Sequence, residues 1–346
     1  MTERGIILSI MKKCFKLILV ILCLLIRKTI AEEKYTYTDI VTIKWGSKAG
    51  EIGKGFDDII SLPYIIKANA NINKVFLYDN TNTRIESFDY DGNHLHSIPT
   101  DIEFGNTIFF DTKNNIILLK SDIVGPKIDM RRYSSEGVFL NKFDLTPENL
   151  NIVEYGYFFI VDQTQLIFSN LDNNRKYWEL NMGTGAIIRD VEPRCITHKN
   201  GVKYIIRKKE ELVDKKNNKY KYYIETKDKN GKIVNRFPID DDLGAYDVSF
   251  VDKNNFIYLL YELSETLIDP DNFEVLGHEV KLAIAKYNDL GELILKQKLM
   301  EDYDSEGLGN KRHSFLDIDI NGNIFQILGK NDGVHILKWE QKTVSP

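Results

Sequence analysis

Short runs of apolar and aromatic residues alternate with clusters of turn residues along most of the chain. In the stretch KVFLYDNTNTRIESFDYDGNHLHSIP, which covers residues 74–99, two turns separate three such runs, and residues 65–68 add another upstream. Asp91-Gly92 predicts a hairpin between the last two runs, because a type I′ turn requires positive φ at both central residues. The pattern therefore predicts four consecutive antiparallel strands.

This four-strand unit recurs along the rest of the chain. The six copies cover residues 65–98, 108–143, 152–180, 195–237, 248–300 and 315–339. Most of them have a glycine in the turn between the third and fourth strands, at Gly137, Gly231 and Gly291. Repeated units of four antiparallel strands are typical of β-propellers, in which each unit forms one blade. We therefore predict an all-β fold, a six-bladed β-propeller of four-stranded antiparallel blades.

The sixth copy has only three predicted strands before the chain ends. Residues 35–45 (YTYTDIVTIKW) form a predicted strand that belongs to no copy. Pairing this N-terminal strand with residues 334–339 would complete the last blade and close the ring. Closure would also remove two free sheet edges, which otherwise favour aggregation.

The first copy and the segment before it resemble a known family. They contain the Gly-rich lead-in GSKAGEIG (residues 46–53), Leu62-Pro63 and the stretch VFLYDNTNTRIESFDYDGN. This combination resembles the opening blade of NHL-repeat, six-bladed β-propeller proteins, over about fifty residues. Later copies lack the Asn-x-Arg-Ile element, and Tyr64 replaces the glycine usual after the proline. The resemblance implies a fold and a binding face but no particular activity.

The N-terminus differs from the rest of the chain. Lys12, Lys13 and Lys16 precede an uninterrupted apolar run over residues 17–26, and residues 29–31 offer small side chains to a signal peptidase. The run is shorter than the roughly 20 apolar residues of a membrane span. We predict a signal peptide over residues 1–31 and one propeller domain over residues 32–346. An uncleaved membrane anchor is the alternative.

Removal of the signal changes the charge and the cysteine count. Six of the 46 basic residues and one of the 51 acidic residues lie in residues 1–31, which leaves 40 basic and 50 acidic side chains. A net charge of about −10 disfavours nucleic-acid binding. Only Cys195 remains beyond the signal, so the exported chain would have no internal disulfide. We expect a monomer in the periplasm, the cell envelope or the extracellular space.

The predicted links differ in length between the two ends of the blades. Third and fourth strands are joined by tight turns, whereas residues 121–127, 208–219 and 263–277 predict long loops between second and third strands. Antiparallel strands alternate in direction, so these long loops all lie at the other end. Long loops on a rigid scaffold often carry function. We therefore expect binding at the long-loop face.

Acidic residues cluster in predicted loops of that face. Asp240, Asp241 and Asp242 form one run, Asp304 and Glu306 belong to a second, and His313 precedes the last innermost strand. Carboxylates suit Ca²⁺, although neither run has EF-hand spacing. We take these six residues as candidate ligand-binding residues. A solvated acidic rim is the competing interpretation. We expect no cofactor, unless these residues bind Ca²⁺.

Histidines offer little catalytic potential. His94 and His96 flank Leu95 in a predicted strand, so both rings are expected on one side, where we interpret them as a surface pair. His313, near Asp317 and Asp319, is the histidine most worth testing. The chain has no Gly-rich phosphate loop, nucleophile elbow or paired-cysteine motif.

The sequence therefore favours an exported, non-catalytic propeller that binds a protein or glycan partner through its long-loop face. The alternative is a metal-dependent hydrolase or lyase, with Ca²⁺ or Zn²⁺, of the lactonase or amidating-lyase type. In either case, contact with a membrane is expected only through an uncleaved signal segment.

Overall fold

A computed structural model describes most of the predicted propeller domain. The described residues are 33–53, 65–102, 107–111, 113–121, 128–145, 158–162, 165–169, 177–181, 187–190, 195–197, 202–214, 219–239, 248–268, 275–299 and 316–343. The chain divides into a small unit, residues 1–36 with 341–346, and a large unit, residues 37–340. Of the small unit, only the ends of two strands are described, and the following paragraphs concern the large unit. No helix suited to crossing a membrane occurs among the described residues.

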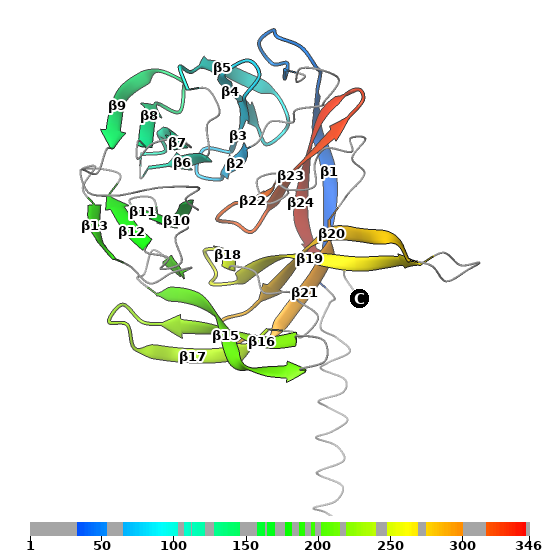
Figure 1. Cartoon of the computed structure of the whole chain (residues 1–346). Coiled ribbons are helices and arrows are strands. Elements are labelled where there is room, and N and C mark those ends of the chain that lie inside the picture. Colours follow the sequence, from blue (N-terminus) through cyan, green and yellow to red (C-terminus); the bar gives the residue numbers. More distant parts are fainter. Residues whose placement is uncertain are drawn as a thin grey trace, which may run out of the picture. The chain divides into compact units, whose positions relative to one another are not determined.

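The described strands form six four-stranded sheets (Figure 1). Five sheets consist of four strands consecutive in the chain, and the sixth combines β1 with the last three strands. The sheets are β2(Ile65–Asn69), β3(Lys74–Asp79), β4(Arg84–Asp89) and β5(His94–Pro99); β6(Thr107–Phe110), β7(Ile116–Ser121), β8(Ile128–Tyr133) and β9(Phe139–Leu145); β10(Phe158–Asp162), β11(Gln165–Ser169), β12(Tyr177–Asn181) and β13(Ile187–Asp190); β14(Cys195–Thr197), β15(Lys203–Asp214), β16(Lys219–Lys227) and β17(Ile233–Pro238); β18(Val248–Val251), β19(Ile257–Ile268), β20(Val275–Tyr287) and β21(Leu293–Lys298); and β22(Leu316–Ile318), β23(Ile324–Lys330), β24(Gly333–Thr343) and β1(Glu33–Ile43).

The third sheet differs from the predicted one. We expected its strands over residues 152–155, 157–161, 166–171 and 176–180, but the fourth strand is β13, at 187–190. The first predicted strand, 152–155, lies outside the described residues. The prediction was wrong by one strand, because the third copy was ended at residue 180 and β13 lies beyond it, after the Gly-rich residues 182–186.

The N-terminal strand β1 pairs with β24, and the two strands run in opposite directions. The ring of Tyr37 lies 4.9 Å from that of Trp339, whereas the carbonyl of Ile43 lies against Gly333. Strand β1 therefore forms the outermost strand of the sixth sheet, the position that β5, β9, β13, β17 and β21 occupy in the other sheets.

The hairpin turns are not of the predicted type I′. At the turn of residues 89–93, Gly92 has φ of 86°, and Asp91 is not among the residues with positive φ. The pairing of β4 with β5 shifts by one residue between Ser87 and Phe88. Gly137, Gly231 and Gly291 occupy equivalent turns with the same shift. These features define a type I turn followed by a glycine bulge, which inserts one extra residue.

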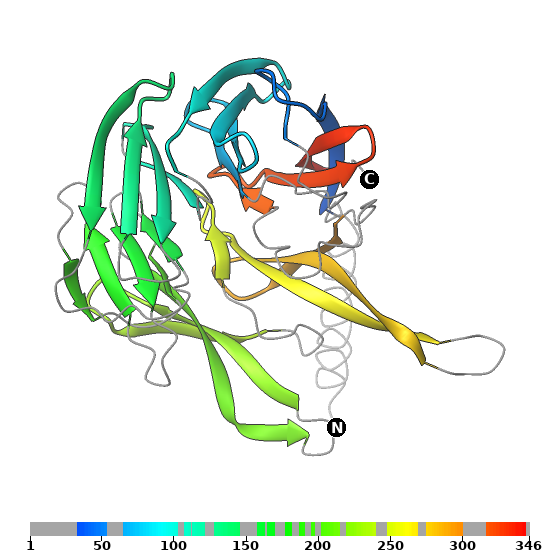
Figure 2. The same ribbon diagram turned by 45° about the horizontal axis from the view of Figure 1, so that its top comes forward.

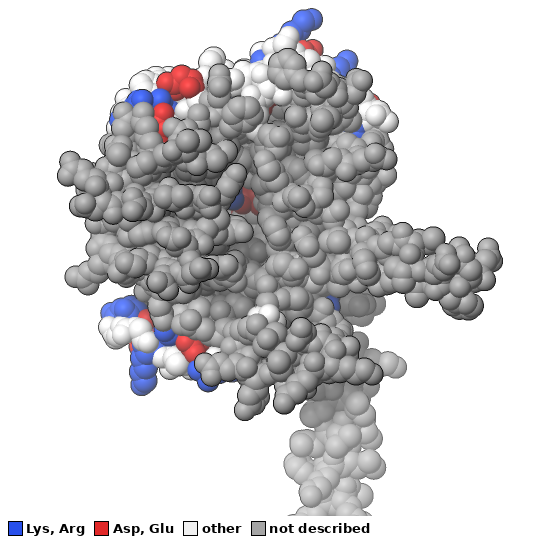
Figure 3. All heavy atoms as spheres, in the orientation of Figure 1, with Lys and Arg blue, Asp and Glu red and all other residues white. Residues whose placement is uncertain are grey.

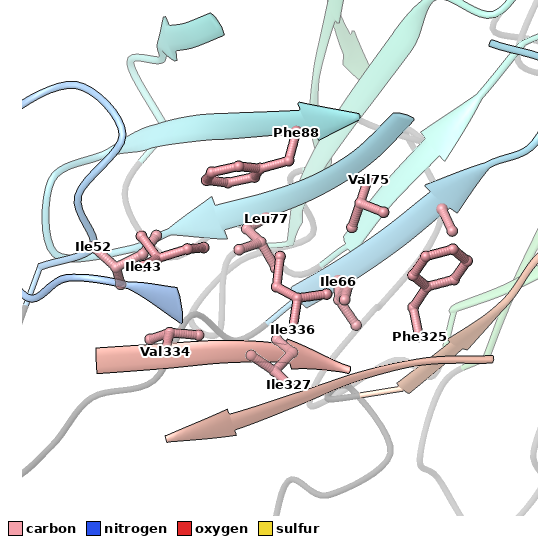
Figure 4. Packing of buried hydrophobic residues seen from close by; sticks show 11 residues of the cluster. Ile43, Ile52, Ile66, Val75, Leu77, Phe88, Phe325, Ile327, Val334 and Ile336 are labelled. Atoms are coloured by element: carbon pink, nitrogen blue, oxygen red, sulfur yellow. The ribbon is translucent and has the colours of Figure 1, made fainter. Parts of the chain in front are cut away.

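Neighbouring sheets pack face to face through apolar side chains. One buried cluster joins the sixth sheet, through Phe325, Ile327 and Ile336, to the first sheet, through Ile66 and Leu77 (Figure 4). A second cluster joins the first two sheets, and a third joins the sheets that contain β16 and β20. Burial between sheets therefore provides the core, as expected for blades that cannot bury both faces alone.

Three of the described hairpin turns contact the neighbouring sheet in the same way. Each of these turns, which join third and fourth strands, packs against the outermost strand of the preceding sheet, whereas nothing lies within 4 Å of a side chain placed at Gly231. A side chain at Gly137 would collide with Ile98 of β5, and one at Gly291 would collide with Phe237 of β17. A side chain at Gly92 would collide with the carbonyl of Ile40, in β1. The sixth and first sheets therefore meet as consecutive sheets do.

Candidate functional site

Two predicted loops are in fact β-ribbons. Strands β15 and β16 remain paired from Lys203↔Lys227 to Asp214↔Lys219, with two irregularities. Strands β19 and β20 pair from Ile257↔Tyr287 to Ile268↔Val275. The predicted loops 208–219 and 263–277 were therefore wrong over most of their length. Figure 2 shows each ribbon projecting away from its sheet.

The ribbons extend past their flanking strands. Strand β14 pairs with β15 only as far as Ile205, and β17 pairs with β16 only as far as Tyr223. In the fifth sheet, β18 pairs with β19 only as far as Leu259, and β21 pairs with β20 only as far as Ala283. Past these points, the two strands of each ribbon pair only with each other, among the strands that the structure describes. We call the corresponding end of the sheets the ribbon end and the opposite end, with the tight turns, the turn end.

The two ribbons differ in charge. The first, residues 207–214 with 219–222, contains five basic and three acidic residues. The second, residues 260–268 with 275–282, contains three acidic residues and one lysine. Charged residues near an open strand edge discourage random pairing with other chains. The ribbons therefore offer two extended backbone edges with different electrostatic character.

The candidate residues chosen from the sequence cannot be placed. Asp240, Asp241, Asp242, Asp304, Glu306 and His313 all lie outside the described residues. Within the part of the chain that is described, no group of three or more His, Cys, Asp or Glu side chains could hold a metal ion.

Asp317 and Asp319 belong to the sequence DIDINGN, which has the same spacing as the first half of a calcium-binding loop. Asp317 forms an ion pair of 2.6 Å with Lys67 and accepts a hydrogen bond of 2.8 Å from the amide of Ala68. Both partners lie in β2, so this pair joins the innermost strands of the sixth and first sheets. Burial raises the pKa of Asp317, although the charge of Lys67 opposes the rise.

Asp319 is also occupied by protein groups. Its Oδ1 accepts hydrogen bonds from the amides of Asn321 and Asn323, at 2.8 and 3.0 Å. Its Oδ2 accepts hydrogen bonds from the amide side chain of Asn323 and from the hydroxyl of Tyr90. Burial and the nearby Asp319 raise the pKa of Tyr90. The carboxylate therefore shapes a turn and joins two sheets.

Ser97, His94 and Glu86 lie close together but do not form a catalytic triad. The hydroxyl of Ser97 donates to Glu86 Oε2 at 2.6 Å, and His94 Nε2 lies 2.8 Å from the same oxygen. The Ser97 hydroxyl lies 3.3 Å from that same Nε2. In a triad, the hydroxyl and the carboxylate contact different nitrogens of the imidazole. The arrangement therefore differs from that of a catalytic triad.

His94 and His96 point to opposite sides of their sheet, contrary to our expectation. The glycine bulge pairs Ser87 with His96 but Phe88 with His94, which leaves Leu95 as the extra residue. His94 packs edge-on against Phe88 at 5.3 Å, whereas His96 Nε2 lies 2.8 Å from Glu136 in the next sheet. The one-residue insertion reverses the alternation of side chains.

The residues that carry the family resemblance clamp the lead-in segment onto the first sheet. Arg84 donates to the carbonyls of Ser47, Lys48 and Glu51 at 2.6 to 2.8 Å. Its Nε also lies 2.6 Å from Oε1 of the fully buried Glu86. Such forked donation to several oxygens is characteristic of arginine.

Asp79 and Asn82 complete this clamp. Asp79 accepts hydrogen bonds from the amide of Gly53 at 3.1 Å and from the side chain of Asn82 at 2.7 Å. Asn82 also donates to the carbonyl of Gly46 at 3.0 Å. The Asp, Asn and Arg of this motif therefore have a structural role, which the sequence pattern alone did not reveal.

Comparisons with known proteins agree on the fold. No protein-family model and no curated protein matches the sequence. A solved member of the DUF4221 family from Bacteroides vulgatus has 10% identity, covers 91% of this chain and 100% of that chain, and has a TM-score of 0.51. An auxiliary nutrient binding protein from Bacteroides ovatus has 11% identity, coverages of 89% and 77%, and a TM-score of 0.46. Virginiamycin B lyase from Staphylococcus aureus has 11% identity, coverages of 88% and 99%, and a TM-score of 0.42. The structural neighbours are propeller-type proteins, and the fold of this chain is all-β and propeller-like.

Proposed function

We propose that this chain is an exported, non-catalytic, six-bladed β-propeller of the NHL-repeat type, which binds a protein or glycan partner through the ribbon end. The ribbons carry this proposal. Each extends a blade by a two-stranded segment that no neighbouring strand supports among the described residues. Isolated two-stranded segments are only marginally stable in water. A partner that contacts the two ribbons would stabilise them and would explain why the chain has both.

Two observations support a closed ring of six blades. Gly92 packs on β1 as Gly137 packs on β5 and Gly291 on β17. In addition, β2 contacts both β22 and β6, which are the first strands of its two neighbouring sheets. A closed ring would hold the two ribbons on adjacent blades in a fixed relation. Preorganised elements bind with a smaller loss of conformational entropy.

The edges of the ribbons suit recognition of an extended segment. Backbone groups on an unpaired strand edge can form main-chain hydrogen bonds with an added strand, and alternate side chains then provide specificity. A protein partner would use both features, whereas a glycan would use mainly the polar side chains. The different charges of the two ribbons would fix the orientation of either partner.

The experiment shortens each ribbon separately. In one variant, Lys208 is joined to Tyr222 by the four residues 80–83, which connect β3 to β4 in this chain; Lys208 and Tyr222 are register partners, as are Asp79 and Arg84. In a second variant, the same turn joins the register partners Leu263 and Lys281. Each protein is used as bait in a cross-linked pull-down from its native compartment, analysed by mass spectrometry.

We expect both variants to fold and at least one of them to lose the partner. A matched control replaces the turn of residues 228–232, at the turn end, by that of residues 89–93, and this control should keep the partner. The proposal fails if both shortened variants fold and retain every partner of the unaltered chain.

A further inference from the structure

Two asparagine–glycine pairs lie in turns that the structure describes, and their surroundings differ. Asn230-Gly231 lies in the turn between β16 and β17, and Asn321-Gly322 lies in the turn between β22 and β23. A third pair, Asn200-Gly201, lies outside the described residues. The side-chain amide of an asparagine can be attacked by the backbone nitrogen of the next residue, and glycine, which has no side chain, hinders this attack least. The structure around each pair then decides which of the two reacts.

The two turns share one backbone conformation. Gly231 and Gly322 have φ of 81° and 85°. Their amides donate to the carbonyls of Asp228 and Asp319 at 2.9 and 2.8 Å. In each turn, a carboxylate oxygen of the same aspartate accepts hydrogen bonds from the two amides that flank the glycine. A difference in reactivity must therefore come from the side chains and from the packing around the turns.

The pair in the sixth sheet is held by the fifth sheet. The ammonium of Lys253 donates to the side-chain oxygen of Asn321 at 2.7 Å, and the backbone amide of Lys253 donates to the carbonyl of Ile320 at 3.0 Å. Gly322 is buried, and a Cβ placed on it would lie 2.4 Å from the hydroxyl of Tyr258. Attack on Asn321 requires its side chain and backbone to rotate, so these contacts would have to break first.

The pair in the fourth sheet is open to solvent. Asn230 and Gly231 are both exposed, and nothing in the described part of the chain lies within 4 Å of a Cβ placed on Gly231. The backbone amide of Asn230 donates to Asp228, but its side-chain amide has no hydrogen-bond partner among the described residues. At this turn, blue and white atoms gather at the lower left of Figure 3. The side chain of Asn230 is therefore free to rotate toward the nitrogen of Gly231.

The charges of this turn also favour the attack. Lys229 and Lys232 are exposed on the two sides of the pair, and Asp228 is the one acidic residue of the turn. The nitrogen of Gly231 must lose its proton before it can attack, and nearby positive charges stabilise the negative charge that develops. Two ammonium groups against one carboxylate give a favourable balance, although solvent and salt screen it.

We propose that the fold exposes Asn230 to spontaneous deamidation, with water as the only co-reactant, and protects Asn321. The backbone nitrogen of Gly231 loses its proton and bonds to the side-chain carbonyl carbon of Asn230. The bond from that carbon to the amide nitrogen breaks, and ammonia leaves. Water then opens the resulting succinimide ring. Cleavage at the side-chain carbonyl gives aspartate, and cleavage at the main-chain carbonyl gives isoaspartate, in which the backbone runs through the former side chain.

The turn can accept either product. Both add one negative charge to the turn end of the fourth sheet. Isoaspartate also lengthens the backbone before Gly231 by one methylene, so the turn cannot keep all of its hydrogen bonds. Because nothing rests on Gly231, this change does not reach the neighbouring sheet, whereas at Asn321 it would disturb the contact with Lys253. The inference is independent of the proposed partner binding, which uses the ribbon end.

The test incubates the folded full chain at neutral and at mildly alkaline pH and maps its peptides by mass spectrometry over time. Conversion of amide to acid is followed at Asn230 and at Asn321. Methyl transfer from S-adenosylmethionine by an isoaspartyl methyltransferase identifies the isoaspartate. The same incubation in urea gives both rates for the unfolded chain. Asn230→Gln is the matched variant, because its longer side chain forms a cyclic imide far more slowly.

In the folded chain, we expect Asn230 to convert about tenfold or more faster than Asn321, because the packed turn must open before it reacts. Alkaline pH should speed the conversion, and Asn230→Gln should abolish it at this position. In urea, the two rates should become similar. Equal rates in the folded chain, an Asn230 that stays intact when folded but converts in urea, or a rate ratio that is unchanged in urea would each overturn the proposal.

Discussion

The imidazole Nδ1 of His335 lies 2.6 Å from Oδ2 of Asp39, in the sheet that β1 and β24 share. Its Nε2 lies 3.0 Å from Asp332 Oδ1, and Thr42 Oγ1 lies 3.2 Å from Nδ1. One histidine thus contacts a carboxylate from the N-terminal strand and another from the turn before β24. Any change in its charge acts on the pairing of the first and last strands.

The pairing of β1 with β24 should depend on pH. Burial alone would lower the pKa of His335, but hydrogen bonds to Asp332 and Asp39 and their negative charges outweigh burial and raise it. Because the pKa of the folded state is raised, this contribution to stability is fully present below the unfolded value of about 6.5. It is lost as the pH rises through the pKa of the folded state.

Urea unfolding over about pH 5 to 9 measures this contribution. The stability difference between the unaltered chain and His335→Gln should be largest at the acidic end and shrink with rising pH. Asp39→Asn serves as the matched variant. It removes one of the two carboxylates that contact His335, so the stability that His335 contributes at acidic pH should be smaller than in the unaltered chain. A difference that is constant across the range would contradict the account.

Substitution of Gly92 should destabilise the fold more than the same substitution of Gly231. Both glycines have positive φ, of 86° and 81°. A side chain at Gly92 would collide with Ile40, whereas Gly231 has open space around it. We expect Gly231→Ala to cost about 1 kcal/mol, from backbone conformation alone. Gly92→Ala should cost about 3 kcal/mol, measured by denaturant unfolding, and equal costs would show that the turn does not press on β1.

Loss of Arg84 should destabilise the first sheet less when Glu86 is also made neutral. Arg84→Met removes the guanidinium that contacts the fully buried Glu86 and that donates to three backbone carbonyls, and it should cost about 3 to 5 kcal/mol. Arg84→Met with Glu86→Gln removes both charges and should recover part of that loss. A double-mutant cycle by urea unfolding measures the coupling. A double variant as unstable as the sum of the single ones would contradict a specific ion pair.

Metal content separates binding from the enzymatic alternative. We expect the purified protein without residues 1–31 to contain no stoichiometric Ca²⁺ or Zn²⁺, because Asp317 and Asp319 are engaged by Lys67 and by turn amides. Elemental analysis before and after dialysis against EDTA measures this directly. One equivalent of either metal, with loss of stability on its removal, would favour the metal-dependent hydrolase or lyase.

Much of the repeat pattern could be predicted from the sequence because strands buried on both faces, such as β3 and β23, form short apolar runs between turn residues. The glycines of the hairpin turns were also recognisable. The turn type was not, since a glycine with positive φ suits both a type I′ turn and a type I turn with a bulge. Because of that ambiguity, we expected His94 and His96 on the same side of their strand. The bulge instead directs them to opposite sides of the sheet.

The ribbons were missed for a different physical reason. Residues 208–219 are mostly charged or polar, and a strand is recognised in a sequence by the apolar residues that its burial requires. A ribbon that projects from its sheet lacks that constraint, so its sequence resembles a loop. The clamp of Arg84, Asp79 and Asn82 was likewise hidden, because its partners are backbone groups that any sequence provides.

Cross-link mapping on the captured complex tests the central claim most directly. An amine-reactive reagent can report on Lys208, Lys209, Lys219 and Lys221 in the first ribbon and Lys281 in the second, and on Lys113, Lys229, Lys232 and Lys253 at the turn end. Binding through the ribbon end predicts that links to the partner concentrate on the ribbon lysines. A complex whose links concentrate on the turn-end lysines, with none to either ribbon, would contradict it.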